Sequence, residues 1–262
     1  MADVFEKRLR RAEQLEKEWP FAAELLGFWS GVLSLQQEYF RKCLEPGSDA
    51  RADPSDGFRF LDRLIELTEQ HGPPALTEAG QILKTLSFAD RSVALGAFFG
   101  RDPSLPMNDP SAFFWMFLVQ PFEMVKRSLE PGKVPEGNPS EPAATCPRCR
   151  HHPVVSVLRE DKAAETVRRS LICSFCCHEW EFPRVLCPSC TEEKPEKLPR
   201  YSAQEIPWMR VEGCDTCGKY LKSVDLTVNW DADPVVDELA STPLDVIAHE
   251  HGYVKIAPNL GK

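Results

Sequence analysis

The stretch LICSFCCHEWEFPRVLCPSC, from Leu171 to Cys190, decides how the second half of the chain folds. It holds five of the chain's 10 cysteines and contains two Cys-x-x-Cys pairs, Cys173/Cys176 and Cys187/Cys190. Two such pairs can supply the four thiolates of one tetrahedral metal site. The alternative is that each pair belongs to a different site whose other half lies elsewhere in the chain.

An internal repeat decides between these arrangements. Two further pairs flank the stretch, namely Cys146/Cys149 and Cys214/Cys217. Cys187 lies 41 positions after Cys146, and Cys214 lies 41 positions after Cys173. In both copies 23 residues separate a C-P-x-C pair from a C-x-x-C pair, so the sequence predicts two tandem modules of one kind.

Each predicted module supplies one complete set of four candidate ligands. The sets are Cys146, Cys149, Cys173 and Cys176 in the first module, and Cys187, Cys190, Cys214 and Cys217 in the second. A nested arrangement, in which the two central pairs form one site, has a feasible spacing but ignores the repeat. Cys177 competes with Cys176 as a ligand; the offset of 41 favours Cys176 and leaves Cys177 as a neighbouring thiol.

Four thiolates suit both zinc and rubredoxin-type iron, so the donor set leaves the metal open. His151, His152 and His178 lie close to the pairs, but four cysteines already complete each shell, so we expect these histidines outside it. A thioredoxin-like dithiol function is disfavoured because the four pairs form two matched sets without a βαβ pattern. A purely structural zinc role remains an alternative for both sites.

The cysteines also divide the chain, because nine of the 10 lie between Cys146 and Cys217. The part before them has helical periodicity, and EPGKVPEGNPSEPAAT (130–145) suits neither a helix nor a strand. The predicted fold class is α+β, with an all-helical N-terminal domain, two tandem small-β rubredoxin-like (zinc-ribbon-like) modules and a short helical tail. The expected parts are a helical domain (1–130), a proline-rich linker (131–145), the two modules (146–182 and 183–230) and an acidic helical tail (231–262).

Within the helical domain, periodicity predicts helices over 3–19, 21–40 and 58–67, with another around Ile82–Leu86. An aromatic-rich helix should begin near Ser111, and Pro121 should end or kink it before a further turn or two toward Leu129. Its aromatic residues are expected in the core, with a partner-binding face as the alternative: Phe113, Phe114, Trp115 and Phe117.

Charge and hydropathy exclude several function classes. The formal net charge is -9, and the stretch from Cys146 to Trp230 has 13 basic against 12 acidic residues. Eight bound thiolates and two divalent ions would make that stretch net negative, which disfavours nucleic-acid binding. No apolar run has the length of a membrane helix, and the N-terminal stretch lacks a secretory signal. We therefore expect a cytoplasmic protein with reduced thiols.

Motifs of catalysis are missing from the sequence. It has no nucleophile elbow, P-loop or dinucleotide fingerprint, and His249 and His251 lack the partners of a catalytic zinc motif. The sequence therefore predicts a protein that is not an enzyme and has no catalytic residues.

The cysteine-rich half resembles the formate dehydrogenase accessory protein family FdhE. The stretches that carry the resemblance are CPRCRHHPVVSVLRE (146–160), RSLICSFCCHEW (169–180), RVLCPSC (184–190), RVEGCDTCGKYLKSVDL (210–226) and DPVVDELASTPLDVIAHEHGY (233–253). The helical half matches only in general character. The family commonly has glycine after the first pair, where this chain has Arg150; only Cys217 is followed by glycine here.

The resemblance implies a cytoplasmic, non-enzymatic assembly factor that binds the catalytic subunit of formate dehydrogenase during its maturation. It also implies two metal ions per chain, iron rather than zinc, held by the eight cysteines of the two sets. Neither nucleic acid nor membrane insertion is expected, and a homodimer is left open. Two alternatives remain, namely a zinc-ribbon module that binds nucleic acid or acts in transcription, and a rubredoxin-like electron carrier.

Overall fold

The computed structural model describes residues 4–45, 47, 54–100, 109–129, 144–162 and 164–257, with the backbone alone at 54, 56 and 127–129. The chain forms two compact units, Met1–Lys133 and Val134–Lys262. Most of the expected linker (131–145) lies outside the described residues.

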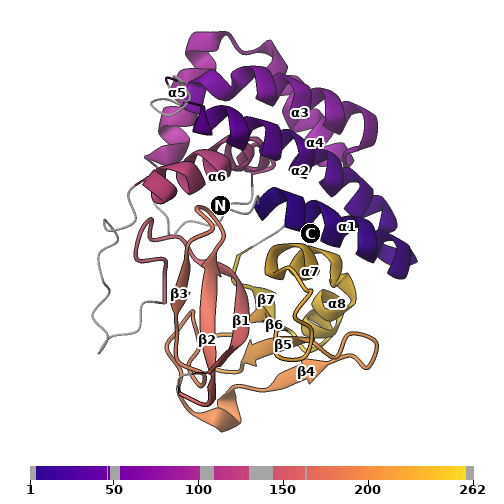
Figure 1. Cartoon of the computed structure of the whole chain (residues 1–262), viewed down its shortest axis with the longest axis vertical. Helices are drawn as coiled ribbons and strands as arrows, with labels where there is room; N and C mark the ends of the chain where they lie inside the picture. The colour runs from indigo at the N-terminus through magenta and orange to yellow at the C-terminus, as the bar shows by residue number, and fades with distance from the viewer. Residues whose placement is uncertain are drawn as a thin grey trace. The chain divides into compact units, whose positions relative to one another are not determined.

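The first unit is helical, as expected (Figure 1). Helix α2 contacts α1, α3 and α6, and α4 contacts α3 and α6, so their apolar sides share one core. Phe114, Trp115 and Phe117 of α6 are buried in it, which confirms the core reading of these aromatics, while Phe113 is half-buried. The elements are α1 (Val4–Glu18), η1 (Pro20–Ala22), α2 (Ala23–Leu44), η3 (Pro54–Gly57), α3 (Phe58–His71), α4 (Pro74–Thr85), α5 (Phe88–Phe99) and α6 (Ser111–Leu129).

One helix of this unit differs from expectation. Helix α5 was not anticipated, because exposed apolar residues such as Phe88 and Val93 obscure its periodicity.

Helix α6 continues through Pro121 to Leu129, where the sequence left open an end or a kink followed by a further turn or two. Proline has no N–H and leaves the carbonyl four residues earlier without its helical donor. The Nε2 of Gln36 in α2 donates to this carbonyl, Phe117 O, at 3.4 Å.

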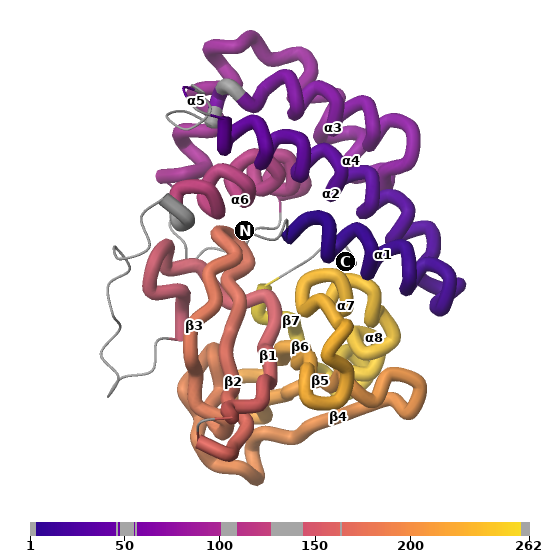
Figure 2. Tube along the Cα trace, viewed as in Figure 1, coloured from indigo at the N-terminus to yellow at the C-terminus, as the bar shows by residue number. Residues whose placement is uncertain are grey.

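The second unit contains one seven-stranded sheet (Figure 2). Strands β3, β2 and β1 form the first module's antiparallel sheet, and β6, β5 and β4 form the second's. The two join where β1 and β6 pair in parallel, with Val155 opposite Lys222. The strands are β1 (Pro153–Asp161), β2 (Thr166–Cys173), β3 (Glu179–Glu181), β4 (Arg200–Ser202), β5 (Met209–Cys214), β6 (Lys219–Asp225) and β7 (Val254–Lys255).

The repeat seen in the sequence is also present in the strand register. Leu171 pairs with Trp180 in the first module, and Glu212 pairs with Leu221 in the second, both 41 positions later. The first strand of each module departs from this offset. Val157 pairs with Ser170, whereas Tyr201 pairs with Val211, so β4 follows β1 by 44 positions. The segment before β4 contains a turn of 3-10 helix, η4 (Pro195–Lys197), which accommodates the difference.

The tail is helical, as expected, and packs onto the sheet of its own unit. Helix α7 (Pro234–Ala240) contacts β1 and β6, and α8 (Thr242–Glu250) contacts β4 and β5. Asp233 caps α7, since its Oδ1 accepts hydrogen bonds from the amides of Val235 and Val236 at 3.1 and 3.2 Å. The tail also supplies β7, which pairs with β6 and was not anticipated. Within the described ranges, none of the helices combines the length and apolar character of a bilayer span.

Two acidic side chains of the tail neutralise buried lysines. Lys222 and Lys255 are buried together with Glu238 and Asp245. The Nζ of Lys222 lies 2.7 Å from Asp245 Oδ2, and that of Lys255 lies 3.1 Å from Asp245 Oδ1. Both lysines also pair with Glu238. Burial alone would raise the pKa of Asp245, but the two lysines hold it below its usual value.

Candidate metal centres

The first cluster brings together the sulfurs of Cys146, Cys149, Cys173 and Cys176. The Sγ atoms of Cys149 and Cys173 are 3.3 Å apart, those of Cys149 and Cys176 are 3.5 Å apart, and those of Cys146 and Cys176 are 3.7 Å apart. Two of the ligands come from the turn before β1, and the other two come from the end of β2 and the turn after it. All four sulfurs lie within 4.8 Å of one another.

The second cluster has the same construction from Cys187, Cys190, Cys214 and Cys217. The Sγ atoms of Cys190 and Cys214 are 3.6 Å apart, and those of Cys187 and Cys217 are 3.8 Å apart. Each cluster therefore combines a turn with the pair 23 residues later, and the fold has two tandem four-cysteine modules, as predicted. The nested arrangement is not found.

Four thiolates at these distances fit a tetrahedral metal ion. With metal–sulfur bonds of about 2.3 Å, the edge of a sulfur tetrahedron is about 3.8 Å long. The distances of 3.3 to 3.8 Å approach that edge in both clusters. The clusters thus have the ligand number and spacing for zinc or iron, and the donor set does not discriminate between them.

A left-handed residue closes each of the four Cys-x-x-Cys turns. The residue after the second cysteine has positive φ in every turn: Arg150 (67°), Cys177 (53°), Thr191 (59°) and Gly218 (66°). This conformation lets the amide of Arg150 donate to Cys146 O at 2.8 Å, and that of Gly218 to Cys214 O at 2.8 Å. The turn therefore forms without glycine at three of the four positions.

Cys177 occupies one of these left-handed positions rather than a place in the cluster. Among the described residues, the groups able to hold a metal comprise only the eight paired cysteines. The histidines near the pairs serve other contacts: His151 stacks on Phe175 with ring centroids 4.1 Å apart, and its Nδ1 lies 3.0 Å from Cys149 O. His178 stacks on Trp180.

The four thiols of the first cluster cannot all ionise without a cation, because their pKa values shift in opposite directions. Burial raises the pKa of Cys173 well above its usual value. Hydrogen bonds from Cys149, and then from Cys173 and Cys176, lower the pKa of Cys146. One thiolate is thus stabilised at the expense of its neighbours, and a cation is needed to bring all four into the charged form.

The thiols of the second cluster also have pKa values shifted in opposite directions. Burial raises the pKa of Cys187. Burial also opposes ionisation of Cys214, but the backbone amides of Cys217 and Thr216 hold its pKa below the usual value. Amides that point at sulfur favour the thiolate, as metal–thiolate turns require.

Arg169 connects the first module to the segment that leads into the second cluster. Its Nε donates to Ser156 Oγ at 2.9 Å within the first module. Its Nη1 donates to the carbonyls of Pro183 and Leu186 at 2.8 and 3.0 Å. Its Nη2 lies 2.6 Å from Glu212 Oε2 on β5. The buried guanidinium therefore holds both modules in one arrangement.

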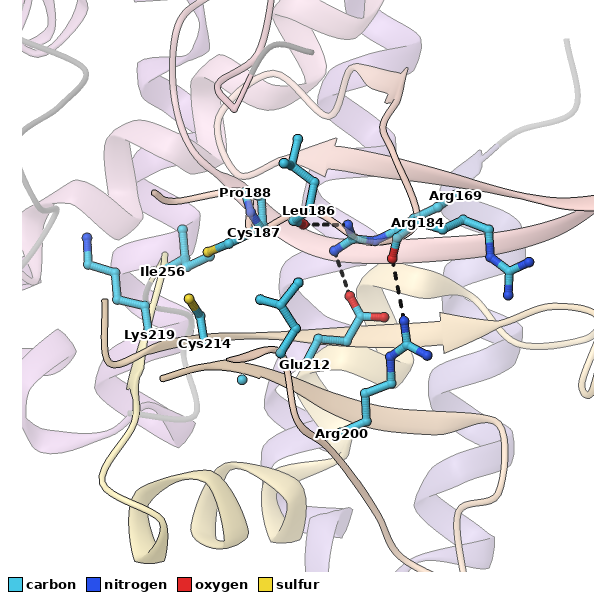
Figure 3. A pocket seen from close by; sticks show the side chains of 12 residues that line it. Arg169, Arg184, Leu186, Cys187, Pro188, Arg200, Glu212, Cys214, Lys219 and Ile256 are labelled. Atoms are coloured by element: carbon cyan, nitrogen blue, oxygen red, sulfur yellow. Dashed lines mark hydrogen bonds and ion pairs between the residues drawn. The ribbon is translucent and has the colours of Figure 1, made fainter. Parts of the chain in front are cut away.

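A cavity of about 20 Å³, enough for one water molecule, lies beside this network (Figure 3). Cys187 and Cys214 of the second cluster line it, with Glu212 between the side chains of Arg169 and Arg200. The sequence analysis missed Glu212 and the cavity. A usable signal was the alternation of Arg210 and Glu212 with apolar residues in β5, which places both charges on one face of the strand.

Comparisons with known proteins agree with the geometry. Residues 145–184 match the model "FdhE, central domain", and residues 185–261 match "FdhE, C-terminal domain". The chain is 36% identical to the "Protein FdhE homolog" of Pseudomonas aeruginosa, over 98% of this chain and 89% of that one. It is 30% identical to "Protein FdhE" of Escherichia coli O1:K1 / APEC, over 82% and 69%.

A solved structure is similar over nearly the full length. The crystal structure of the FdhE protein from Pseudomonas aeruginosa superposes with a TM-score of 0.74 at 27% identity. It covers 98% of this chain and 95% of that one. The similarity therefore includes the helical unit, which carries no recognisable motif of its own.

Proposed function

Because the chain belongs to the FdhE family, we propose that it is a non-enzymatic accessory factor for the maturation of formate dehydrogenase. It acts by binding the catalytic subunit of that enzyme in the cytoplasm before the enzyme is complete. The observation that carries the proposal is the pair of four-cysteine clusters on one sheet, within a chain that matches its relatives over both units.

In this proposal the eight paired cysteines are ligands, and each module holds one metal ion. We favour iron, which is the metal that the family resemblance implies, with zinc as the alternative. The ion converts four buried thiols into a neutralised thiolate shell and fixes each pair of turns. The metal modules extend over 146–182 and 183–230, and the tail completes the fold of the second one.

A shared sheet makes the two metal sites parts of one rigid scaffold. The parallel pairing of β1 with β6 and the contacts of Arg169 join the modules. A scaffold of this kind can present side chains to a partner without changing shape. Its function would then depend on metal through folding, with or without redox chemistry.

Co-purification tests the proposal. A tagged form of this chain is expressed with an untagged formate dehydrogenase catalytic subunit, and the bound fraction is measured after affinity purification. We expect the wild-type chain to retain the subunit, and a Cys149→Ser/Cys190→Ser variant to retain far less. Failure of the metal-loaded wild-type chain to retain the subunit would overturn the proposal.

A further inference from the structure

Basic side chains outnumber carboxylates around the cavity beside the second cluster. Its lining includes Arg169, Arg184, Arg200 and Lys219, but only one carboxylate, Glu212. Cys187 and Cys214 also line it, so the metal-loaded second cluster reduces this positive excess without cancelling it. The chain as a whole has a net charge of -9, so this local excess is opposite in sign to the rest of the molecule. Such an excess attracts anions to one place on an otherwise acidic protein.

Glu212 does not neutralise Arg184, Arg200 and Lys219, since Arg169 and Arg210 occupy both of its oxygens. Its Oε2 lies 2.6 Å from Arg169, and its Oε1 lies 3.0 Å from Nη2 of Arg210. In the part of the chain that the structure describes, Arg184, Arg200 and Lys219 have no carboxylate within ion-pair distance.

Positive charges of neighbouring arginines outweigh the carboxylate of Glu212 at Arg200. Burial and then repulsion from Arg210 lower the pKa of Arg200, and Glu212 does not offset them. Among the described residues, its guanidinium has one hydrogen bond, a 3.5 Å contact with the carbonyl of Arg184, which leaves donors available for a ligand. Figure 3 shows the Arg184 side chain directed away from Glu212.

Arginines of the first module are paired differently. Arg159 pairs with Glu179, and Arg168 pairs with both Asp161, at 3.1 Å, and Glu181. Arg168 is exposed and Arg159 is half-buried, and each has an acidic partner. The unpaired charge is thus a local property of the second module and provides a matched control within the same sheet.

The shape of the site limits what can bind there. The cavity has room for about one water molecule, too little for a free phosphate or nucleotide. Arg184 and Arg200 are exposed residues of its lining, with the Arg184 side chain directed outward, and Leu186 and Ile256 add apolar wall. A surface of this kind suits side-chain carboxylates presented on an extended or helical segment.

We propose that the basic mouth of this cavity, formed by Arg184, Arg200 and Lys219, binds an acidic peptide segment of a partner protein. Carboxylates of the segment pair with the two guanidinium groups at the rim, and the apolar wall receives its neighbouring side chains. The proposal rests on the proposed function only for the identity of the partner, which would be the catalytic subunit of formate dehydrogenase.

Fluorescence anisotropy with a labelled hexaglutamate peptide tests the site without the partner. We expect the metal-loaded wild-type chain to bind the peptide, with an affinity that falls as salt increases. Arg184→Ser/Arg200→Ser should weaken binding about tenfold, whereas Arg159→Ser/Arg168→Ser, which removes the same charge from the first module, should change it less than about twofold.

Three outcomes would overturn the proposal. Equal loss in both double variants would mean that the peptide senses only overall charge. Displacement of the peptide by millimolar sulfate would identify a site for small oxyanions instead. Loss of metal from the Arg184→Ser/Arg200→Ser variant, with peptide binding unchanged, would show that these arginines serve the thiolate cluster.

The same variants separate this proposal from the general one. If the wild-type chain and Arg184→Ser/Arg200→Ser retain the catalytic subunit equally, the basic mouth is not the docking site, but the accessory function stands. If only that variant loses the subunit, both proposals are supported. If the wild-type chain binds hexaglutamate but not the subunit, the site stands and the partner is wrong.

Discussion

Arg169 and Glu212 join the two metal modules through a buried ion pair, with Nη2 of the arginine 2.6 Å from Oε2 of the glutamate. Arg169 belongs to β2 of the first module and Glu212 to β5 of the second. Arg210, which follows Arg169 by the repeat offset of 41, binds the other oxygen of the same carboxylate. A repeated arginine and a single shared acid thus connect two copies of one unit.

Removal of that acid should destabilise the second unit strongly. Glu212→Gln leaves the buried Arg169 without its countercharge, and loss of one partner of a buried pair costs about 3–5 kcal/mol. Urea denaturation of the metal-loaded protein at pH 7 measures the effect. The control is Glu181→Gln, which breaks an exposed pair with Arg168 and should cost less than about 1 kcal/mol. Equal costs for the two variants would contradict the role of the junction.

The same carboxylate should make stability depend on pH. Burial would raise the pKa of Glu212, but Arg169 and Arg210 hold it below the ordinary value of 4.5. A carboxylate with a depressed pKa contributes its full stabilisation above about pH 4.5 and loses it as pH falls through the lower folded value. The difference in unfolding free energy between wild type and Glu212→Gln should therefore be constant from pH 8 to 5 and shrink below pH 4.5. If this difference in unfolding free energy grew as the pH fell, the pKa of Glu212 would not be lowered in the folded protein.

Cysteine spacing was sufficient to predict the clusters because covalent spacing and a repeat are both visible in one sequence. The 41-position offset paired the correct turns, and the strand registers of Leu171 and Glu212 carry the same offset. The family resemblance is also confirmed, and it extends to the helical unit. What remains a prediction is that metal binds and which metal it is.

Substitution of neighbouring cysteines should discriminate ligand from bystander. Cys176→Ser should remove about one metal ion per chain, because Cys176 Sγ is part of the first cluster. Cys177→Ser should keep both ions, since Cys177 lies outside that set and serves as the left-handed residue of the turn. Metal content by mass spectrometry checks both variants. The reverse result would place Cys177 in the shell.

Backbone strain predicts a stabilising substitution at the second cluster. Thr191 has φ of 59°, a conformation that costs an L-residue about 1–2 kcal/mol and glycine almost nothing. We expect Thr191→Gly to raise the unfolding free energy by about 1 kcal/mol, and Gly218→Thr, at φ 66°, to lower it by a similar amount. Thr191→Ala is the control, because it removes the hydroxyl but keeps the strain. A gain with alanine equal to that with glycine would refute this explanation.

The buried ion pairs predict that loss of a buried lysine costs far more stability than loss of an exposed one. Lys255→Met removes one of two cations that neutralise Glu238 and Asp245, and should cost about 3–5 kcal/mol. Lys197→Met, at an exposed position in η4, should cost less than about 0.5 kcal/mol. Chemical denaturation of both variants measures the difference. If Lys255→Met is as stable as wild type, the charges are not held together as described.

The hydrophobic pattern of one strand or helix does not reveal polar contacts with elements that are distant in the sequence. Lys222 lies in the strand sequence KYLKSVD, where alternation predicts an inward position but no reason for a buried cation. Its partners Glu238 and Asp245 come from two helices of the tail, and their positions follow from the packing of α7 on β1 and β6 and of α8 on β4 and β5. The sequence of α6 likewise does not show that Gln36 of α2 donates to the carbonyl that Pro121 leaves free. Long-range contacts decided each case.

Metal content of protein purified without added metal or reducing agent tests the central claim most directly. The account predicts two ions per chain in the wild type and about one in each of Cys149→Ser and Cys190→Ser, because the two clusters share no ligand. Visible charge-transfer bands would identify iron, and their absence with two zinc ions would favour the zinc alternative. Less than one ion per chain, with the cysteines paired in disulfides, would contradict the account.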